Sequence, residues 1–106
     1  MVSKVIDLTQ NWVIHFDSLV KNEIPLKMEE KDGVISFFVP FDRHRGITVE
    51  LMTLKEEEQI VEGKYTANPF SYKEEVVFKI LKVGKLLGKP QGSMSRDVWM
   101  ISSIPK

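Results

Sequence analysis

Cysteine is absent from this chain of 106 residues, and its absence excludes several kinds of chemistry. Disulfide bonds, thiolate zinc sites, iron–sulfur clusters and cysteine nucleophiles all need that side chain. We therefore expect packing alone to stabilise the fold. The first four residues lack the cationic and apolar regions of a signal peptide, so a cytoplasmic location is the default expectation.

Long apolar runs and an excess of one charge are missing as well. The longest apolar stretch, residues 34–39, is interrupted by Ser36 and is far shorter than the roughly 20 residues of a membrane span. Fifteen basic and fifteen acidic residues cancel, so the whole molecule has no general attraction for nucleic acid or anionic membranes. We expect one soluble domain over residues 1–106, with no membrane partner.

Two segments have apolar residues at helical spacing. In the first, residues 9–22, the apolar positions are Leu8, Trp12, Phe16, Leu19 and Val20, and Ile14 lies roughly opposite them. The second, residues 71–87, opens with the capping pair Ser71 and Glu74, and its face carries Val76, Ile80, Val83 and Leu87. Both segments are predicted to be amphipathic helices.

A three-strand meander is predicted between these segments. Residues 26–31 alternate up to Asp32-Gly33, a dipeptide that favours a two-residue hairpin turn, and strands follow over residues 34–41 and 47–54. One face of the last two strands carries the main apolar alternation, and the other carries Val34, Ser36, Phe38, Pro40, Thr48, Glu50, Met52 and Leu54.

The remaining segments complete the predicted fold. Residues 53–66 fit either a helix capped by Thr53 and Glu56 or a fourth strand. Residues 98–104 are predicted to be a final strand. We expect an α+β domain in which an antiparallel sheet of four or five strands packs on two helices.

This order of elements resembles the type III secretion chaperone-like fold. In that fold a leading helix, a strand meander, a second helix and a closing strand form a scaffold that dimerises. The segments that carry the resemblance are residues 9–22, 27–40, 46–54, 71–87 and 97–105. The resemblance implies a dimer, but no motif of the family is matched and no functional residue is carried over.

No catalytic, metal or cofactor site is predicted. His15 and His44 lie on different elements without ligands at metal-binding spacing. His44 follows Asp42 by two residues, but no nucleophile is identifiable beside them. Residues 84–90 contain glycines and lysines but lack the phosphate-loop spacing. We therefore expect a protein that is not an enzyme and needs no cofactor.

The loop after the second strand carries the strongest local signal. It holds Arg43, His44 and Arg45, with two of the three arginines in the chain. Arginine binds phosphate or carboxylate, and Phe38 on an open sheet face would stack a base. Alternatively, the loop is only a turn, and a helix or a second subunit covers Phe38.

Two functional hypotheses remain open at this point. The first is a non-catalytic protein-interaction or assembly module that forms a homodimer, or binds a protein partner, through the face bearing Phe38 and Met52. The second is a binder of single-stranded RNA or DNA that uses the Arg43 and Arg45 loop with exposed aromatic side chains. The zero net charge favours the first.

Overall fold

A single antiparallel sheet dominates the structure, which is a computed structural model describing residues 2–16, 23–41, 43–68, 72–91 and 98–104. A short 3-10 helix precedes the strands, and no α-helix occurs in these ranges. The elements are η1 (Val2–Lys4), β1 (Asn11–Phe16), β2 (Ile24–Leu26), β3 (Glu29–Lys31), β4 (Val34–Pro40), β5 (Gly46–Lys55), β6 (Ile60–Asn68), β7 (Tyr72–Lys82), β8 (Lys85–Pro90) and β9 (Trp99–Ile104).

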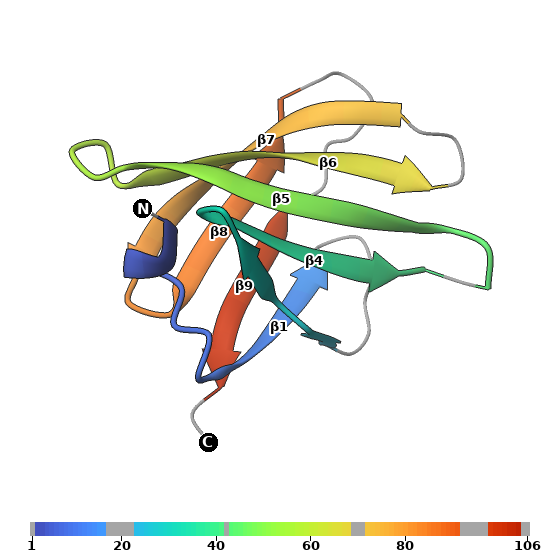
Figure 1. Cartoon of the computed structure of the whole chain (residues 1–106), viewed down its shortest axis with the longest axis horizontal. Helices are drawn as coiled ribbons and strands as arrows, with labels where there is room; N and C mark the ends of the chain where they lie inside the picture. Colours follow the sequence, from blue (N-terminus) through green and yellow to red (C-terminus); the bar gives the residue numbers. More distant parts are fainter. Residues whose placement is uncertain (1, 17–22, 42, 69–71, 92–97, 105–106) are drawn as a thin grey trace.

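The sheet curls into a half-barrel (Figure 1). Its strand order is β2-β1-β9-β8-β7-β6-β5-β4-β3, and every neighbouring pair is antiparallel. The two edge strands, β2 and β3, follow each other along the chain with only Lys27 and Met28 between them. Because β2 also contacts β4, the two edges of the curled sheet approach each other.

The expected α+β fold, with two helices on a sheet of four or five strands, is wrong. The segment 9–22 contains strand β1, and its residues 17–22 lie outside the described ranges. Within the segment 71–87, the described part forms β7 and the beginning of β8. These two segments supply the helices of the layout that resembles the chaperone-like fold. In both of them the regular structure of the described residues is β-strand.

The meander and the ambiguous segment are also defined by the structure. The hairpin at Asp32-Gly33 is confirmed, with φ of 53° and 81° at the two residues. Residues 53–66 form the end of β5, a turn and most of β6, so the strand alternative holds. The pairing register shifts between Leu51 and Thr53. This bulge turns Leu54 towards the core, away from the face on which the sequence placed it.

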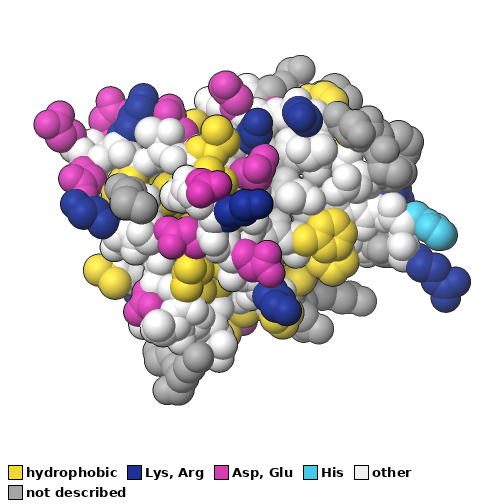
Figure 2. Space-filling model, in the orientation of Figure 1, with side chains coloured by type: hydrophobic (Ala, Val, Ile, Leu, Met, Phe, Trp, Pro, Cys, Tyr) yellow, Lys and Arg dark blue, Asp and Glu magenta, His cyan; other side chains and the backbone are white. Residues whose placement is uncertain are grey.

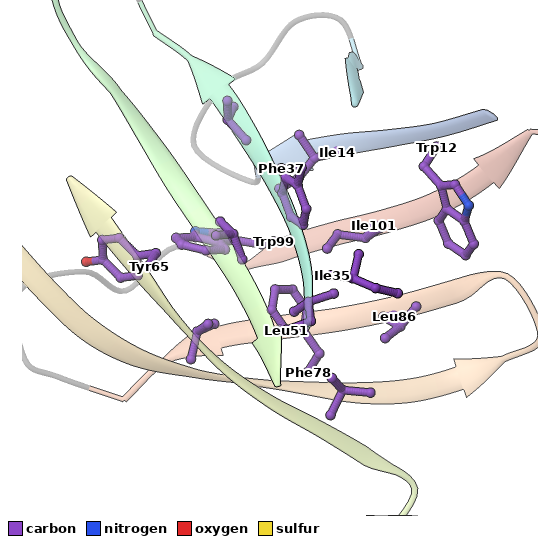
Figure 3. Packing of buried hydrophobic residues seen from close by; sticks show 14 of the residues in the cluster. Trp12, Ile14, Ile35, Phe37, Leu51, Tyr65, Phe78, Leu86, Trp99 and Ile101 are labelled. Atoms are coloured by element: carbon purple, nitrogen blue, oxygen red, sulfur yellow. The ribbon is translucent and has the colours of Figure 1, made fainter. Parts of the chain in front are cut away.

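One apolar core fills the inside of the curl (Figure 3). Side chains at alternate positions of the long strands point inwards, including Ile35 and Phe37 from β4, Phe78 from β7 and Ile101 from β9. Ile14, expected to face outwards, is fully buried. At the end of the half-barrel next to the β5–β6 turn, η1 contributes Val2 to this core.

Candidate functional site

The outer face of β4 and β5 carries two of the predicted site residues. Phe38 and Met52 are 50% and 45% exposed, so the described part of the chain leaves about half of each side chain uncovered. Phe38 lies opposite Thr48 on β5, and its ring also covers Gly46, where an added Cβ would lie 2.5 Å from Phe38 Cζ. Within the described residues, the face bearing Phe38 is therefore partly open.

The other three predicted site residues, Arg43, His44 and Arg45, are exposed in the β4–β5 loop. The Phe41 amide donates a hydrogen bond to the Arg45 carbonyl at 2.9 Å and closes the loop. Basic and histidine side chains project there, at the right margin of Figure 2. The structure thus brings Phe38 and the arginine loop to one end of β5 and places Met52 further along the strand. Asp42, the proposed partner of His44, lies outside the described residues.

An acidic turn lies at the opposite end of β5. It consists of Glu56, Glu57 and Glu58, and acidic side chains gather at this end in Figure 2. Lys4 Nζ donates a hydrogen bond to Glu56 Oε1 at 2.6 Å, and this contact holds the pKa of Glu56 below its usual value. Strand β5 therefore links a basic loop to an acidic turn, although the chain has no net charge.

A shallow hollow of about 200 Å³ opens beside Met52 at the bulge. Gly63 forms part of its wall and supplies no side chain to fill it. The other lining residues are Thr53, Glu62, Lys64, Glu75, Val76 and Val77.

Inside the half-barrel, a carboxylate lies among aromatic side chains. Glu74 occupies an inward position of β7 and is only 8% exposed. Its Oε2 accepts a hydrogen bond from Tyr65 Oη at 2.5 Å and a longer one from Tyr72 Oη at 3.4 Å. Its Oε1 is buried and has no hydrogen-bond partner among the residues that the structure describes.

The rings around this carboxylate form a connected group. The Tyr65 ring centroid lies 5.1 Å from that of Trp99 and 6.3 Å from that of Tyr72. Trp99 also packs edge-on against Phe16, which contacts Phe41 beside the arginine loop. Figure 3 shows Tyr65 and Trp99 on one side of the core and Trp12 at the other.

The surroundings of the two tyrosines disfavour their ionised forms. Burial raises the pKa of Tyr65, and its hydrogen bond to Glu74 adds to the effect. The pKa of Tyr72 is raised through the same causes, desolvation first and then the Glu74 charge. Both hydroxyl groups therefore stay protonated and act as donors to Glu74.

The raised pKa of Tyr65 predicts a loss of stability in alkaline solution. An unfolded tyrosine ionises near pH 10, so the contribution of Tyr65 is complete below that pH and falls as the pH rises towards the folded pKa. One proton gives a slope of up to about 1.4 kcal/mol per pH unit. Urea unfolding of Tyr65→Phe between about pH 8 and pH 11 should show a shallower decline than the wild type.

Tyr72→Phe is the matched control, because Tyr72 is 40% exposed. Its removal should change the slope less than removal of Tyr65. Equal slopes for the wild type and Tyr65→Phe would contradict this account of Tyr65.

Sequence reasoning missed the Glu74 cluster because Glu74 was assigned to a helix cap. One signal was present: Glu74 has the same parity as Val76, Phe78 and Ile80. In a strand this parity places the carboxylate among inward apolar positions.

Neither metal binding nor a membrane span is indicated in the described ranges. They contain no group of three or more acidic or histidine side chains that would hold a metal ion. They also contain no helix that is long and apolar enough to cross a membrane. Comparison with protein-family models, curated proteins and solved structures gives no significant match.

Proposed function

We propose that this protein is a non-catalytic cytoplasmic interaction module that forms a symmetric dimer through the outer face of β4, β5 and β6. The observation that carries the proposal is the arrangement of complementary features about the middle of β5. The basic loop ends at Arg45, five residues before Glu50, and the acidic turn begins at Glu56, six residues after it. A two-fold axis near Glu50 would place each basic loop beside the acidic turn of the partner.

The apolar residues of this face are centred on the same point. Thr48, which lies opposite Phe38, precedes Glu50 by two residues, and Met52 follows it by two. The same axis therefore places Phe38 of one protomer at the same level along the strands as Met52 and the adjoining hollow of the other. The hollow, at about 200 Å³, suits a phenyl ring, because a cavity of roughly 150 Å³ holds benzene.

At the axis itself, Glu50 belongs to a row of alternating charges across three strands. Lys64 lies directly across from it on β6, and Glu75 lies across from Lys64 on β7. Neighbouring opposite charges on a sheet stabilise each other. When Glu50 approaches its counterpart in the partner, Lys64 of each protomer offsets the repulsion between the two carboxylates.

The sheet edges are poorly suited to the alternative of edge-to-edge pairing. Strands β2 and β3 have three residues each; Pro25 lies in the first, and all residues of the second are exposed and charged. Short, charged and proline-containing edges discourage the addition of another strand. Association through a sheet face is therefore favoured.

The mixed character of the face favours a reversible dimer. In Figure 2 the apolar side chains of this face are separate spots among acidic and basic ones. The molecule measures 33 × 29 × 25 Å, so its broad face has room for the roughly 800 Å² that each partner buries in a standard interface.

A charge-swap experiment tests the dimer. Sedimentation velocity should show that Arg43→Glu with Arg45→Glu weakens dimerisation at least about tenfold, since like charges then face each other. Glu57→Lys with Glu58→Lys should weaken it similarly. A mixture of the two double variants should recover dimerisation as a heterodimer, because each altered loop then meets an opposite charge.

Two results would contradict the proposal. One is a wild-type protein that stays monomeric at all concentrations in low salt. The other is unchanged dimerisation of both double variants, accompanied by loss of binding of a labelled single-stranded oligonucleotide by the arginine variant. That second outcome would assign the loop to nucleic acid.

A further inference from the structure

Glu74 is a buried carboxylate without a cationic partner in the described ranges. Two ion pairs in those ranges, Lys4 with Glu56 and Lys55 with Glu62, are on the surface and do not involve Glu74. A buried charge is normally paired, because removal from water carries a large desolvation cost. The two tyrosine hydroxyls stabilise Oε2, but Oε1 accepts no hydrogen bond from the described part of the chain.

We infer that Glu74 Oε1 is the recognition point for a small organic cation with a primary ammonium group. An ionised carboxylate only accepts hydrogen bonds, and an ammonium group only donates them, through three N–H bonds on one compact centre. A guanidinium group fits less well. Its planar fork binds both oxygens of a carboxylate, whereas one oxygen of Glu74 is already held by Tyr65.

The neighbouring rings suit the same ligand. Tyr65 lies between Tyr72 and Trp99, with centroids 6.3 Å and 5.1 Å away. The faces of aromatic rings attract a cation within about 6 Å of the centroid, and desolvation strengthens that attraction. A cation at Oε1 would meet the carboxylate itself and would lie beside the two tyrosines that donate to Oε2, whereas a neutral alcohol would have only the hydrogen bond.

We place the entry to Oε1 at Tyr72. This side chain is 40% exposed, and its hydroxyl is 3.4 Å from Glu74, whereas Tyr65 is 6% exposed and 2.5 Å away. Tyr72 is therefore the more weakly held of the two rings and the one whose displacement opens the carboxylate to solvent. Val76 and Phe78, the next inward positions of β7, are fully buried, so a ligand would reach the carboxylate from the Tyr72 side and its alkyl chain would extend outwards.

The two tryptophans provide a direct assay. The Trp12 indole donates a hydrogen bond to the Asp7 carbonyl at the far end of the core, whereas Trp99 contacts Tyr65. Titration with n-butylammonium chloride, followed by the two indole N–H signals in a ¹H–¹⁵N spectrum, should shift the Trp99 signal saturably and leave the Trp12 signal in place. n-Butanol and sodium butyrate have the same alkyl chain length but lack the ammonium group, so they should not shift the Trp99 signal.

Matched variants separate the carboxylate from general effects of charge. Glu74→Gln keeps the shape and an acceptor for Tyr65, and it should weaken n-butylammonium binding at least about tenfold. Glu30→Gln makes the same charge change at an exposed position of the edge strand β3 and should bind as the wild type does. The same spectra report whether each variant is folded.

Three results would overturn the inference: no saturable shift of Trp99, equal shifts with n-butanol, or unchanged affinity in folded Glu74→Gln. None of them bears on the dimer, because Glu74 faces the core and the proposed interface lies on the outer face of the sheet.

Discussion

Replacement of Phe78 with alanine is expected to lower the free energy of unfolding by about 3–5 kcal/mol. Phe78 is fully buried on β7, its ring centroid lies 6.3 Å from that of Trp99, and its ring covers Gly88 on the neighbouring strand. Removal of the ring leaves a cavity that the surrounding strands cannot fill, because their own hydrogen bonds fix their spacing. Chemical denaturation followed by far-UV circular dichroism measures the loss.

The contact between Phe78 and Gly88 makes this prediction sharper. A Cβ added at Gly88 would lie 2.2 Å from Phe78 Cε2. Gly88→Ala alone should therefore cost about 1–3 kcal/mol through overpacking. In the Phe78→Ala background the clash is gone, so the added cost of Gly88→Ala should nearly vanish.

A double-mutant cycle measures that difference as a coupling of at least about 1 kcal/mol. Val39→Ala, on β4 well away in the strand order, is the control. The loss of stability caused by Val39→Ala should simply add to the loss caused by Gly88→Ala. If the stability costs of Phe78→Ala and Gly88→Ala were instead additive, the Phe78 ring would not cover Gly88 in the way that the structure shows.

The errors in fold prediction have a common physical cause in the periodicity of the two segments. Residues four apart share a face in a helix, but they also share a face in a strand, since four is a multiple of two. Val76 and Ile80 therefore fit both structures. The residues that distinguish the two structures lie two positions from the apolar ones: Phe78 beside Val76 and Ile80, and Ile14 beside Trp12 and Phe16. Each lies on the opposite side of the expected helix, yet each is fully buried.

The hairpin at Asp32-Gly33 was predictable because its signal is local. Both residues have positive φ, and this requirement restricts the residue types that form the turn. The bulge at Leu51 was not predictable in this way, because it arises from the pairing of β5 with β6. The sequence alone therefore placed Leu54 on the wrong face.

The two candidate sites differ in the same way: a local signal locates the first, and the second depends on strands that are distant in the sequence. The arginine loop could be located from sequence because a turn between two strands exposes whatever it contains, and the structure shows Arg43, His44 and Arg45 exposed. Glu74 could not be located until its segment was known to be a strand. Its neighbours Tyr65 and Trp99 come from β6 and β9, and only the curl of the sheet brings them together.

Gly63→Ala is expected to destabilise the protein by about 3 kcal/mol or more, at the upper end of overpacking effects. A Cβ at this position would lie 2.2 Å from the carbonyl oxygen of Glu50 and 3.2 Å from the Leu51 Cα. These are backbone atoms of the paired strand, so no side chain can rotate to make room. The clash should separate β5 from β6 at the bulge and weaken the long central hairpin.

Thermal and denaturant unfolding measure this cost, and hydrogen exchange of the β5 and β6 amides shows where the opening occurs. The neighbouring substitution Lys64→Ala is the control, because Lys64 is half-buried on the outer face and its loss should change stability by about 0.5 kcal/mol or less. A cost below about 1 kcal/mol for Gly63→Ala would mean that the strands can separate freely at the bulge. In that case the bulge could not fix the position of Met52 on the proposed dimer face.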